Sequence, residues 1–300
     1  MIDLPPSEIE RLFAPWVHAE VAQDDPRWSA EAERLTRKAA KMRRRNLVKR
    51  LVGLARDQAD VKRDYQDKIW PTYELAKRLP PKGDSTSIVW GERRFFAGEM
   101  ATKRVHLALL MKTISALNPK RVLEVGSGVG LNLLVLGARF PQVEFIGAEL
   151  TAAGVEATNA AAAEGPPKQV AEFSPEPVEQ SGPLANVRAQ EADARALPFG
   201  DGDFDLVFSA HALEQMEAIR QSAQREMVRV SCAHVAMVEP FADWNAEGLR
   251  RDLIVAKRYF QGSVADLEGL GLAVEYVTGD IPAKLTMGMG FVLAAKAQGG

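Results

Sequence analysis

From Arg121 onwards, short apolar runs alternate with stretches of helical periodicity, and this alternation limits the folds open to the chain. Helical stretches fit between the first five of seven runs of strand length. The runs cover 121–126, 143–150, 187–192, 204–209, 234–239, 272–277 and 290–295. Such alternation is typical of βαβ units around a largely parallel sheet. We therefore predict an α/β fold with a mostly parallel, seven-strand sheet and helices on both faces.

Residues 1–79 show a different pattern, which predicts an N-terminal helical arm. Prolines divide this stretch, and apolar residues recur at helical spacing between Ser29 and Trp70. The recurring residues are Leu35, Met42, Leu47, Leu51, Leu54 and Val61. We expect the arm to be amphipathic and to bury this apolar side.

Three further segments complete the predicted organisation. Residues 80–98 open with a stretch rich in Pro, Gly and Ser, and we interpret them as a linker and lid segment before a main domain at 99–300. A helix is expected to begin near Glu99 and to end at Asn118, before a proline. Residues 164–186 carry five prolines and little periodicity, so we predict a mobile surface insertion and no additional helix there.

Composition excludes several classes of protein. Cys232 is the single cysteine, so the chain forms no internal disulfide and supplies no cysteine cluster for zinc. No stretch approaches the roughly 20 apolar residues of a membrane span, and the N-terminus lacks the basic start of a signal peptide. These features favour a cytoplasmic protein without a membrane span.

The formal net charge of −2 hides a basic run at residues 34–50, which holds nine Lys and Arg residues and no acid. Such a run is compatible with RNA, anionic lipid, an acidic partner or simply a solvated helix face. Because the arm also has an apolar side, we expect it to pack on the main domain or on a second subunit. The sequence thus allows a homo-oligomer formed through the arm, and we do not expect nucleic acid as the main partner.

The segment from Glu124 to Gly130, EVGSGVG, follows the first strand and precedes a helix. Glycines permit a tight turn with close backbone approach to a ligand, and the helix N-terminus offers free N–H donors. A phosphate-binding P-loop would end in Gly-Lys-Ser/Thr, which is absent, and the dinucleotide fingerprint would need glycine where Leu131 stands. The remaining interpretation is an acid-x-Gly-x-Gly-x-Gly loop for a polar ligand.

Acidic residues at the next two strand ends support this interpretation. Glu149 ends the second strand, where a carboxylate in doubly wound folds accepts hydrogen bonds from ribose hydroxyls. Asp193 and Ala194 follow the third strand, where a side chain and a backbone N–H are able to read a purine edge. The three features line one crevice at the switch point of the predicted sheet.

Taken together, residues 100–295 resemble the class I S-adenosylmethionine-dependent methyltransferases, whose fold is Rossmann-like. The stretch ADARALPFGDGDFDLVFSAHALEQM is similar to the small-molecule, type 11-like branch. The resemblance implies S-adenosylmethionine as cofactor, with its methionine end near the glycine loop, its ribose at Glu149 and its adenine at Asp193 and Ala194. The loop residues it implies are Glu124, Gly126, Ser127, Gly128 and Gly130, and Ser209 joins the cofactor set. Many relatives carry Lys-Pro-Gly-Gly before the fifth strand, whereas this chain has 231–233, Ser-Cys-Ala.

Catalysis of methyl transfer depends mainly on alignment and on removal of a proton from the acceptor. His211 leaves the fourth strand beside the expected methyl position and is our candidate general base, with Glu214 three residues later as a residue that orients it. A histidine that only packs in the core or caps a helix is the competing interpretation.

Two groups of residues are candidates for binding the acceptor. Phe241, Asp243 and Trp244 follow the fifth strand, although ordinary loop packing explains them as well. Arg93 and Arg94 precede the main domain and suit a carboxylate or phosphate, although they are also compatible with a solvated pair.

The sequence therefore predicts an enzyme that methylates an oxygen or nitrogen of a small metabolite, such as a sugar or a biosynthetic intermediate. The Asn/Asp-Pro-Pro-aromatic motif of amine-directed nucleic-acid methyltransferases is absent, and no carboxylate cluster suggests a metal. A cofactor-binding scaffold that recruits a partner through the arm, and an RNA methyltransferase, are the alternatives.

Overall fold

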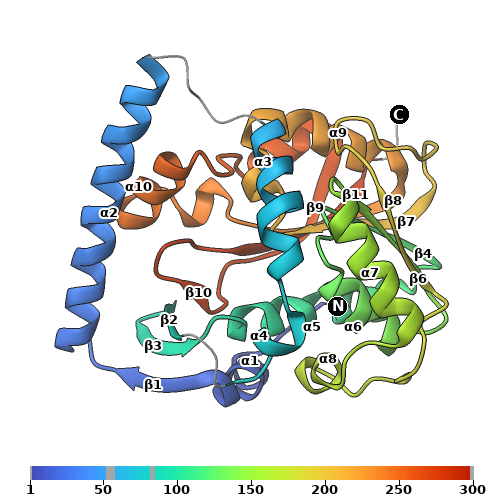
Figure 1. Cartoon of the computed structure of the whole chain (residues 1–300), viewed down its shortest axis with the longest axis horizontal. Helices are drawn as coiled ribbons and strands as arrows, with labels where there is room; N and C mark the ends of the chain where they lie inside the picture. The colour runs from blue at the N-terminus through green and yellow to red at the C-terminus, as the bar shows by residue number, and fades with distance from the viewer. Residues whose placement is uncertain (1, 52–57, 82–84, 298–300) are drawn as a thin grey trace.

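The computed structural model describes residues 2–51, 58–81 and 85–297, and its centre is a seven-stranded sheet in the order β6-β5-β4-β7-β8-β11-β9 (Figure 1). The strands are β4 (Arg121–Val125), β5 (Glu144–Glu149), β6 (Val187–Glu191), β7 (Phe204–Ala210), β8 (Ser231–Glu239), β9 (Leu272–Thr278) and β11 (Gly290–Lys296). The first five in this order pair in parallel, and β11 is antiparallel to both of its neighbours. The predicted α/β fold with a mostly parallel seven-strand sheet is confirmed.

Both faces of the inner strands are buried, which explains why these strands are nearly continuous apolar runs, whereas the edge strands β6 and β9 are partly exposed. Successive residues of one strand point to opposite faces. Val122 and Leu206 therefore belong to one core cluster, whereas Leu123 and Val207 belong to the other. The helices that accompany the sheet are α5 (Ala101–Leu117), α6 (Leu131–Arg139), α7 (Ala152–Glu164), α9 (Arg220–Val230) and α10 (Gly248–Lys257).

A second sheet, which the sequence did not predict, joins distant parts of the chain. Its order is β1-β3-β2-β10, and every pairing is antiparallel. The strands are β1 (Val17–Val21), β2 (Ser85–Trp90), β3 (Arg93–Gly98) and β10 (Ala283–Lys284). The all-helical interpretation of 1–79 and the linker interpretation of 80–98 are therefore wrong at these positions. The sequence VHAEV alternates with a period of two, but five residues are too few to stand out against the surrounding helical pattern.

Residues 164–186 also differ from the predicted mobile insertion. They contain helix α8 (Lys168–Phe173), and its Val170 and Phe173 side chains are buried in the main core. Arg104 of α5 donates hydrogen bonds to the Phe173 and Ser174 carbonyls at 3.0 and 3.1 Å. Its guanidinium also reaches the Leu12 carbonyl of α1 (Pro6–Phe13), so one side chain joins three elements.

The arm continues as α2 (Pro26–Leu51), α3 (Gln58–Asp64), a π-helical turn at Tyr65–Ile69, a 3-10 turn at Trp70–Thr72 and α4 (Leu75–Arg78). Helix α2 runs beside α10 (Figure 1). Arg43 of α2 pairs with Asp252 of α10, and the Asn46 amide donates to the Ala256 carbonyl. Trp28, Leu35 and Ala39 are buried on α2.

The arm thus packs on the main domain within one chain, as one of the two predicted arrangements requires. Of the remaining predicted apolar residues, Leu54 and the side chains of Leu47 and Leu51 lie outside the described residues. Association through the arm stays a prediction.

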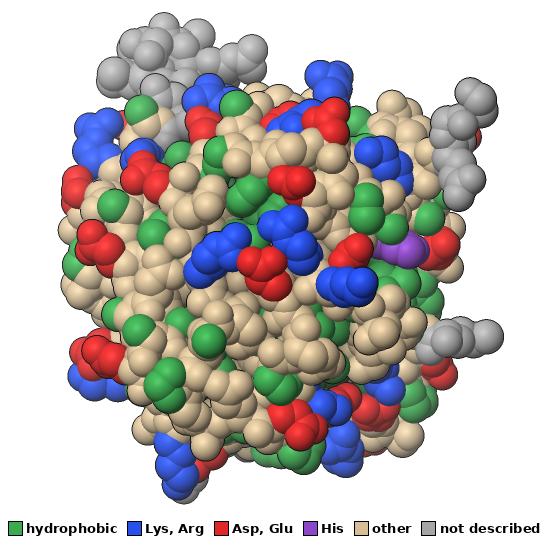
Figure 2. All heavy atoms as spheres, turned by 90° about the vertical axis from the view of Figure 1, so that its right-hand side faces the viewer, with side chains coloured by type: hydrophobic (Ala, Val, Ile, Leu, Met, Phe, Trp, Pro, Cys, Tyr) green, Lys and Arg blue, Asp and Glu red, His purple; other side chains and the backbone are tan. Residues whose placement is uncertain are grey.

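On the face drawn in Figure 2, Lys and Arg side chains are interspersed with Asp and Glu side chains. This face therefore lacks the broad positive potential that favours nonspecific binding of nucleic acid. Among the described residues, no helix combines the length and apolar character required to cross a membrane.

The packing of α2 yields a test. Leu35 is only 5% exposed, so Leu35→Ala should lower the free energy of unfolding by about 2–5 kcal/mol, the usual cost of emptying a buried leucine site. Chemical denaturation measures this change, with Arg37→Ala on the exposed side of the same helix as the control. An unchanged value for Leu35→Ala would show that α2 does not unfold together with the domain.

Candidate functional site

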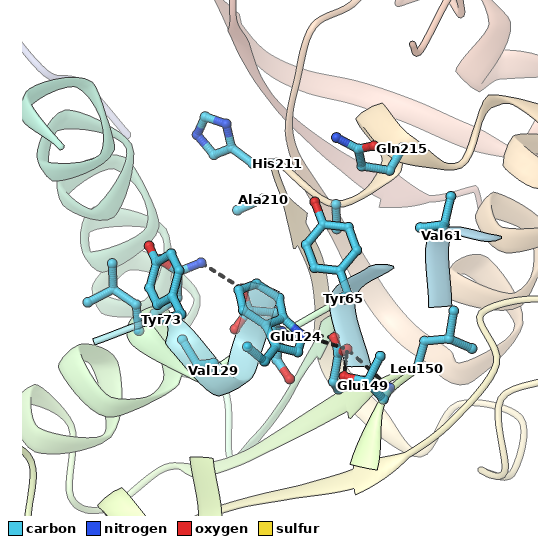
Figure 3. Close-up of a pocket in the computed structure, with 18 of the residues that line it drawn as sticks. Val61, Tyr65, Tyr73, Glu124, Val129, Glu149, Leu150, Ala210, His211 and Gln215 are labelled. Atoms are coloured by element: carbon cyan, nitrogen blue, oxygen red, sulfur yellow. Dashed lines mark hydrogen bonds between the residues drawn. The ribbon is translucent and has the colours of Figure 1, made fainter. Parts of the chain in front are cut away.

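The carboxyl ends of β4, β5 and β7 meet at one edge of the large sheet, and a cavity opens there. Its volume is about 150 Å³, and it is lined by the glycine loop, by residues after β5 and β7, and by the arm between Val61 and Tyr73. A second hollow, beyond β6, shares Gly126 and Glu149 with it. Figure 3 shows His211 and Gln215 at one end of the cavity and Glu149 at the other.

The loop between β4 and α6 depends on its glycines. Gly126 has a φ of +77° and donates its N–H to the Ala148 carbonyl at 2.7 Å, and a Cβ at this position would collide with Ala212. Gly128 has a φ of +56°, and a Cβ there would lie 3.0 Å from the Trp70 ring. Both positions require glycine because the left-handed backbone and the close neighbours exclude a side chain.

Glu149 holds the loop and the start of α7 together. One carboxylate oxygen accepts the Gly128 N–H at 3.0 Å, and the other accepts the Thr151 hydroxyl at 2.7 Å and the Thr151 N–H at 3.1 Å. The Trp70 indole N–H also approaches this second oxygen, at 3.5 Å. Glu149, which we predicted to accept hydrogen bonds from a ribose, therefore faces the cavity. The Trp70 indole N–H of the arm already approaches its carboxylate.

Glu124 lies at the base of the cavity and is 1% exposed. Its Oε1 accepts the Asn132 amide at 2.6 Å, whereas its Oε2 has no hydrogen-bond partner among the described residues. Burial raises the pKa of Glu124 to about 8. The Ser127 hydroxyl is likewise buried without a partner. These two groups are suited to a polar ligand beside the glycine loop.

The second hollow is lined by Asp193 and Ala194, as predicted for the adenine side. Asp193 pairs with Arg195 at 2.6 Å, and this hydrogen-bonded arginine lowers the pKa of the carboxyl. Lys62 of α3 forms an ion pair of 2.6 Å with Glu191 at the end of β6. The arm therefore crosses the hollow and is tied to the sheet on its far side.

His211 lines the cavity in an unusual backbone conformation, with a φ of +58°. Its N–H donates to the Val238 carbonyl at 3.0 Å. The ring Nε2 lies 2.9 Å from Nδ1 of His106, whereas Nδ1 lies 3.9 Å from Glu214 Oε2, which is too long for a hydrogen bond. Burial, together with His106, lowers the pKa of His211 well below its ordinary value, so the ring is neutral at pH 7.

A carboxylate that the sequence interpretation missed fixes this turn. Glu239, at the end of β8, accepts the backbone N–H groups of Ala212, Leu213 and Glu214, each at 3.1 Å. The side chain is fully buried, and desolvation raises its pKa to about 8. A left-handed non-glycine residue costs free energy and persists only when its surroundings hold it. Glu239 provides that restraint for His211.

The structure does not bring every predicted site residue to the cavity. Arg93 pairs with Glu20 at 2.8 Å and with Glu10 at 3.1 Å, and Arg94 donates to the Glu92 carbonyl at 2.8 Å. Neither arginine lines either hollow. Arg93 instead links α1 and β1 to the hairpin of β2 and β3.

The residues predicted after the fifth strand are also elsewhere. Phe241 is fully buried in the core, Trp244 packs against it, and Asp243 accepts the Val264 N–H at 2.9 Å. Ser209 is buried within β7 and does not line the cavity, although His211 two residues later does.

Three aromatic residues of the arm line the cavity although the sequence interpretation left them out. Trp70 packs on Tyr65 and Tyr73, with ring centroids 4.9 and 5.4 Å apart. The aromatic run YQDKIWPTY was the available signal, but nothing in a single sequence says which part of an arm reaches a distant loop. Within the described ranges, no group of three or more potential metal-binding side chains is found.

The raised pKa of Glu239 predicts how stability changes with pH. Between its ordinary value of about 4.3 and about 8, the folded protein retains a proton that the unfolded chain releases. The free energy of unfolding should therefore fall as pH rises from about 7.5 to 8, where histidines of the unfolded chain, with a pKa of about 6.5, are mostly deprotonated. Glu239→Gln cannot ionise and should show a shallower fall.

Urea denaturation at several pH values measures this slope. Exposed Glu164→Gln should keep the wild-type slope. Equal slopes in wild type and Glu239→Gln would mean that Glu239 is ionised throughout, held by its three N–H donors.

Comparison with known proteins agrees with this geometry. Residues 123–234 match the model of a methyltransferase domain family. Over 150 residues the chain is 31% identical to an uncharacterised methyltransferase, YcgJ, of Bacillus subtilis (strain 168). That alignment covers 50% of this chain and 49% of the relative, so the chain spans about half the length of the curated relative it matches.

A solved structure shares the fold over most of the chain. Magnesium protoporphyrin IX methyltransferase of Synechocystis PCC 6803, with S-adenosylhomocysteine bound, superimposes with a TM-score of 0.54 at 12% identity. The superposition covers 80% of this chain and all of the other. Residues 123–234 are therefore similar to a methyltransferase domain, and the sheet that contains them has the fold of that solved structure.

Proposed function

We propose that this protein transfers a methyl group from S-adenosylmethionine to an oxygen or nitrogen of a small metabolite. The observation that carries the proposal is the continuity of the cavity. The loop at 126–130, Glu149 and the Asp193 hollow border adjoining spaces, and the cavity ends at a neutral histidine. An acceptor at that end would lie between a cofactor and a base.

The chain's own groups fit the proposed cofactor. The unpartnered Glu124 Oε2 and Ser127 Oγ suit the polar methionine end, and Glu149 suits ribose hydroxyls. Asp193 and Ala194 suit the adenine edge. When bound, S-adenosylmethionine supplies an electrophilic methyl on sulfur. The protein's part is to align the acceptor, to exclude water and to accept a proton.

His211 is the proposed proton acceptor. A neutral imidazole has a lone pair available at pH 7, and the position of His211 in the lining of the cavity supports a role as general base. The proton of an acceptor hydroxyl, or of the ammonium formed when a neutral amine is methylated, would pass to this ring.

A small acceptor is favoured by the cover that the arm provides. Tyr65, Trp70 and Tyr73 line the cavity from the arm side, opposite the sheet edge. Gln66 accepts the Ala153 N–H of α7 at 3.1 Å, which adds a tie between this cover and the domain. A cavity closed in this way suits a compact metabolite better than a folded RNA.

Isothermal titration calorimetry with S-adenosylmethionine and S-adenosylhomocysteine, followed by incubation with fractionated metabolite extracts, tests the proposal. The expected result is micromolar-range binding and a mass gain of one methyl group in a small product. Binding without turnover on any acceptor would favour the scaffold alternative. Methylation of RNA with strong salt dependence would favour the other alternative.

The role of Glu149 can be measured without an acceptor. Glu149→Ala should weaken cofactor binding by about 1–3 kcal/mol, because a charged hydrogen-bond acceptor is lost. Exposed Glu156→Ala on the adjacent helix is the matched control. Calorimetry gives both affinities, and a thermal melt verifies that the variants are folded. An unchanged affinity in Glu149→Ala would remove this residue from the site.

The role of His211 requires turnover. His211→Ala should lower kcat by roughly 10²–10⁴-fold for a hydroxyl acceptor while cofactor affinity stays constant. The wild-type rate should rise with pH through a pKa below 6.5 and level off by neutral pH, because burial disfavours the imidazolium. Exposed His18→Ala is the control. Full activity in His211→Ala would refute the assignment.

A further inference from the structure

We propose that His106 is a positioning residue that holds the proton of His211 on Nε2 and so leaves Nδ1 as the basic nitrogen of the site. This inference rests on the proposed function, because it concerns how His211 becomes able to accept a proton. His106 lies within α5, in a part of the sequence that no motif singled out.

The contact between the two rings is direct and buried. His106 Nδ1 and His211 Nε2 are 2.9 Å apart, the ring centroids are 5.0 Å apart, and His106 is 2% exposed. Burial lowers the pKa of His106 to about 3 and that of His211 well below its ordinary value. Lys103 of α5 and Lys284 of β10 further disfavour a positive charge on either ring. At pH 7 both rings are therefore neutral.

Two neutral rings at this distance share one proton, so one ring donates and the other accepts. If His106 Nδ1 donated, His211 would carry its own proton on Nδ1 and would have no lone pair for an acceptor molecule. If His211 Nε2 donates, His211 Nδ1 is free. The partner of one imidazole nitrogen thus decides the protonation of the other.

The surroundings of His211 Nδ1 favour the second arrangement. Glu214 Oε2, the nearest carboxylate oxygen, is 3.9 Å away and has no hydrogen-bond partner among the described residues. Burial raises the pKa of Glu214, which favours its protonated form and weakens it as an acceptor for an Nδ1 proton. A lone pair on Nδ1 is compatible with that neighbour. In Figure 3, His211 lies at the end of the cavity away from Glu149.

The chain offers a clean spectroscopic test because it contains four histidines. With ¹⁵N-histidine labelling, long-range ¹H–¹⁵N correlation spectra at pH 7 should show His211 protonated on Nε2 and not on Nδ1. His106→Asn places an amide oxygen near the position of the lost Nδ1 and should preserve this tautomer. His106→Leu, of similar volume, removes the acceptor and should move the His211 proton to Nδ1 or produce a mixture.

A kinetic comparison completes the experiment. His106→Leu should lower kcat at least tenfold and change the pH profile, His106→Asn should recover most of the rate, and the cofactor Kd should stay constant in both. Protonation of His211 on Nδ1 in the wild type, or an unchanged tautomer in a folded His106→Leu, would overturn the proposal. Because the spectra need no acceptor, they decide this point even if no methylation is found. Conversely, a normal rate in His106→Leu would overturn it while leaving the proposed function intact.

Discussion

Parallel pairing of β4 with both β5 and β7 is the constraint on which the rest of the molecule depends. Because the strands run the same way, their carboxyl ends lie at one edge, and everything that follows them must turn there. The glycine loop, Glu149 and the His211 turn are therefore neighbours in space although they are separated by up to 85 positions in the chain. Both faces of the sheet are closed by helices, so this edge is where polar groups are able to meet a ligand.

The sequence predicted this sheet well because burial on both faces leaves a local signature. The inner strands are apolar runs that can be recognised without knowledge of their partners. The second sheet left no such signature. Strand β1 has five residues, none of them buried, β10 has only two residues, and they are joined through a hairpin that lies between them in sequence. Helix α8 was missed for a related reason, since six residues among prolines reveal their role only through burial of Val170 and Phe173.

The residues of the site likewise fall into two groups, those that the sequence predicted and those that only the structure shows. Glu124, Gly126, Gly128 and Glu149 were predictable because a local loop and a fixed strand end determine where they lie. Trp70 lies against the glycine loop, and His106 and Glu239 contact the His211 turn, from elements far away in sequence that only the fold brings there. Arg93, by contrast, was predicted to bind the acceptor but lies outside the site. It is a plausible anion binder by residue type, but its guanidinium is already held by Glu10 and Glu20, which lie more than 70 residues earlier.

The position of the Trp70 indole bears on the apparent affinity for a ligand. For a ligand that binds Glu149 and the glycine loop as proposed, a donor that already approaches Glu149 and a ring that already covers Gly128 would make association an exchange reaction, in which one set of contacts replaces another. The measured affinity is then a difference between two occupants of the same surface, one of them part of the chain. Stronger packing of Trp70 on Tyr65 and Tyr73 would weaken apparent binding without altering any residue that touches the ligand. With the proposed site, the arm would in this way set the ligand concentration range over which the domain responds.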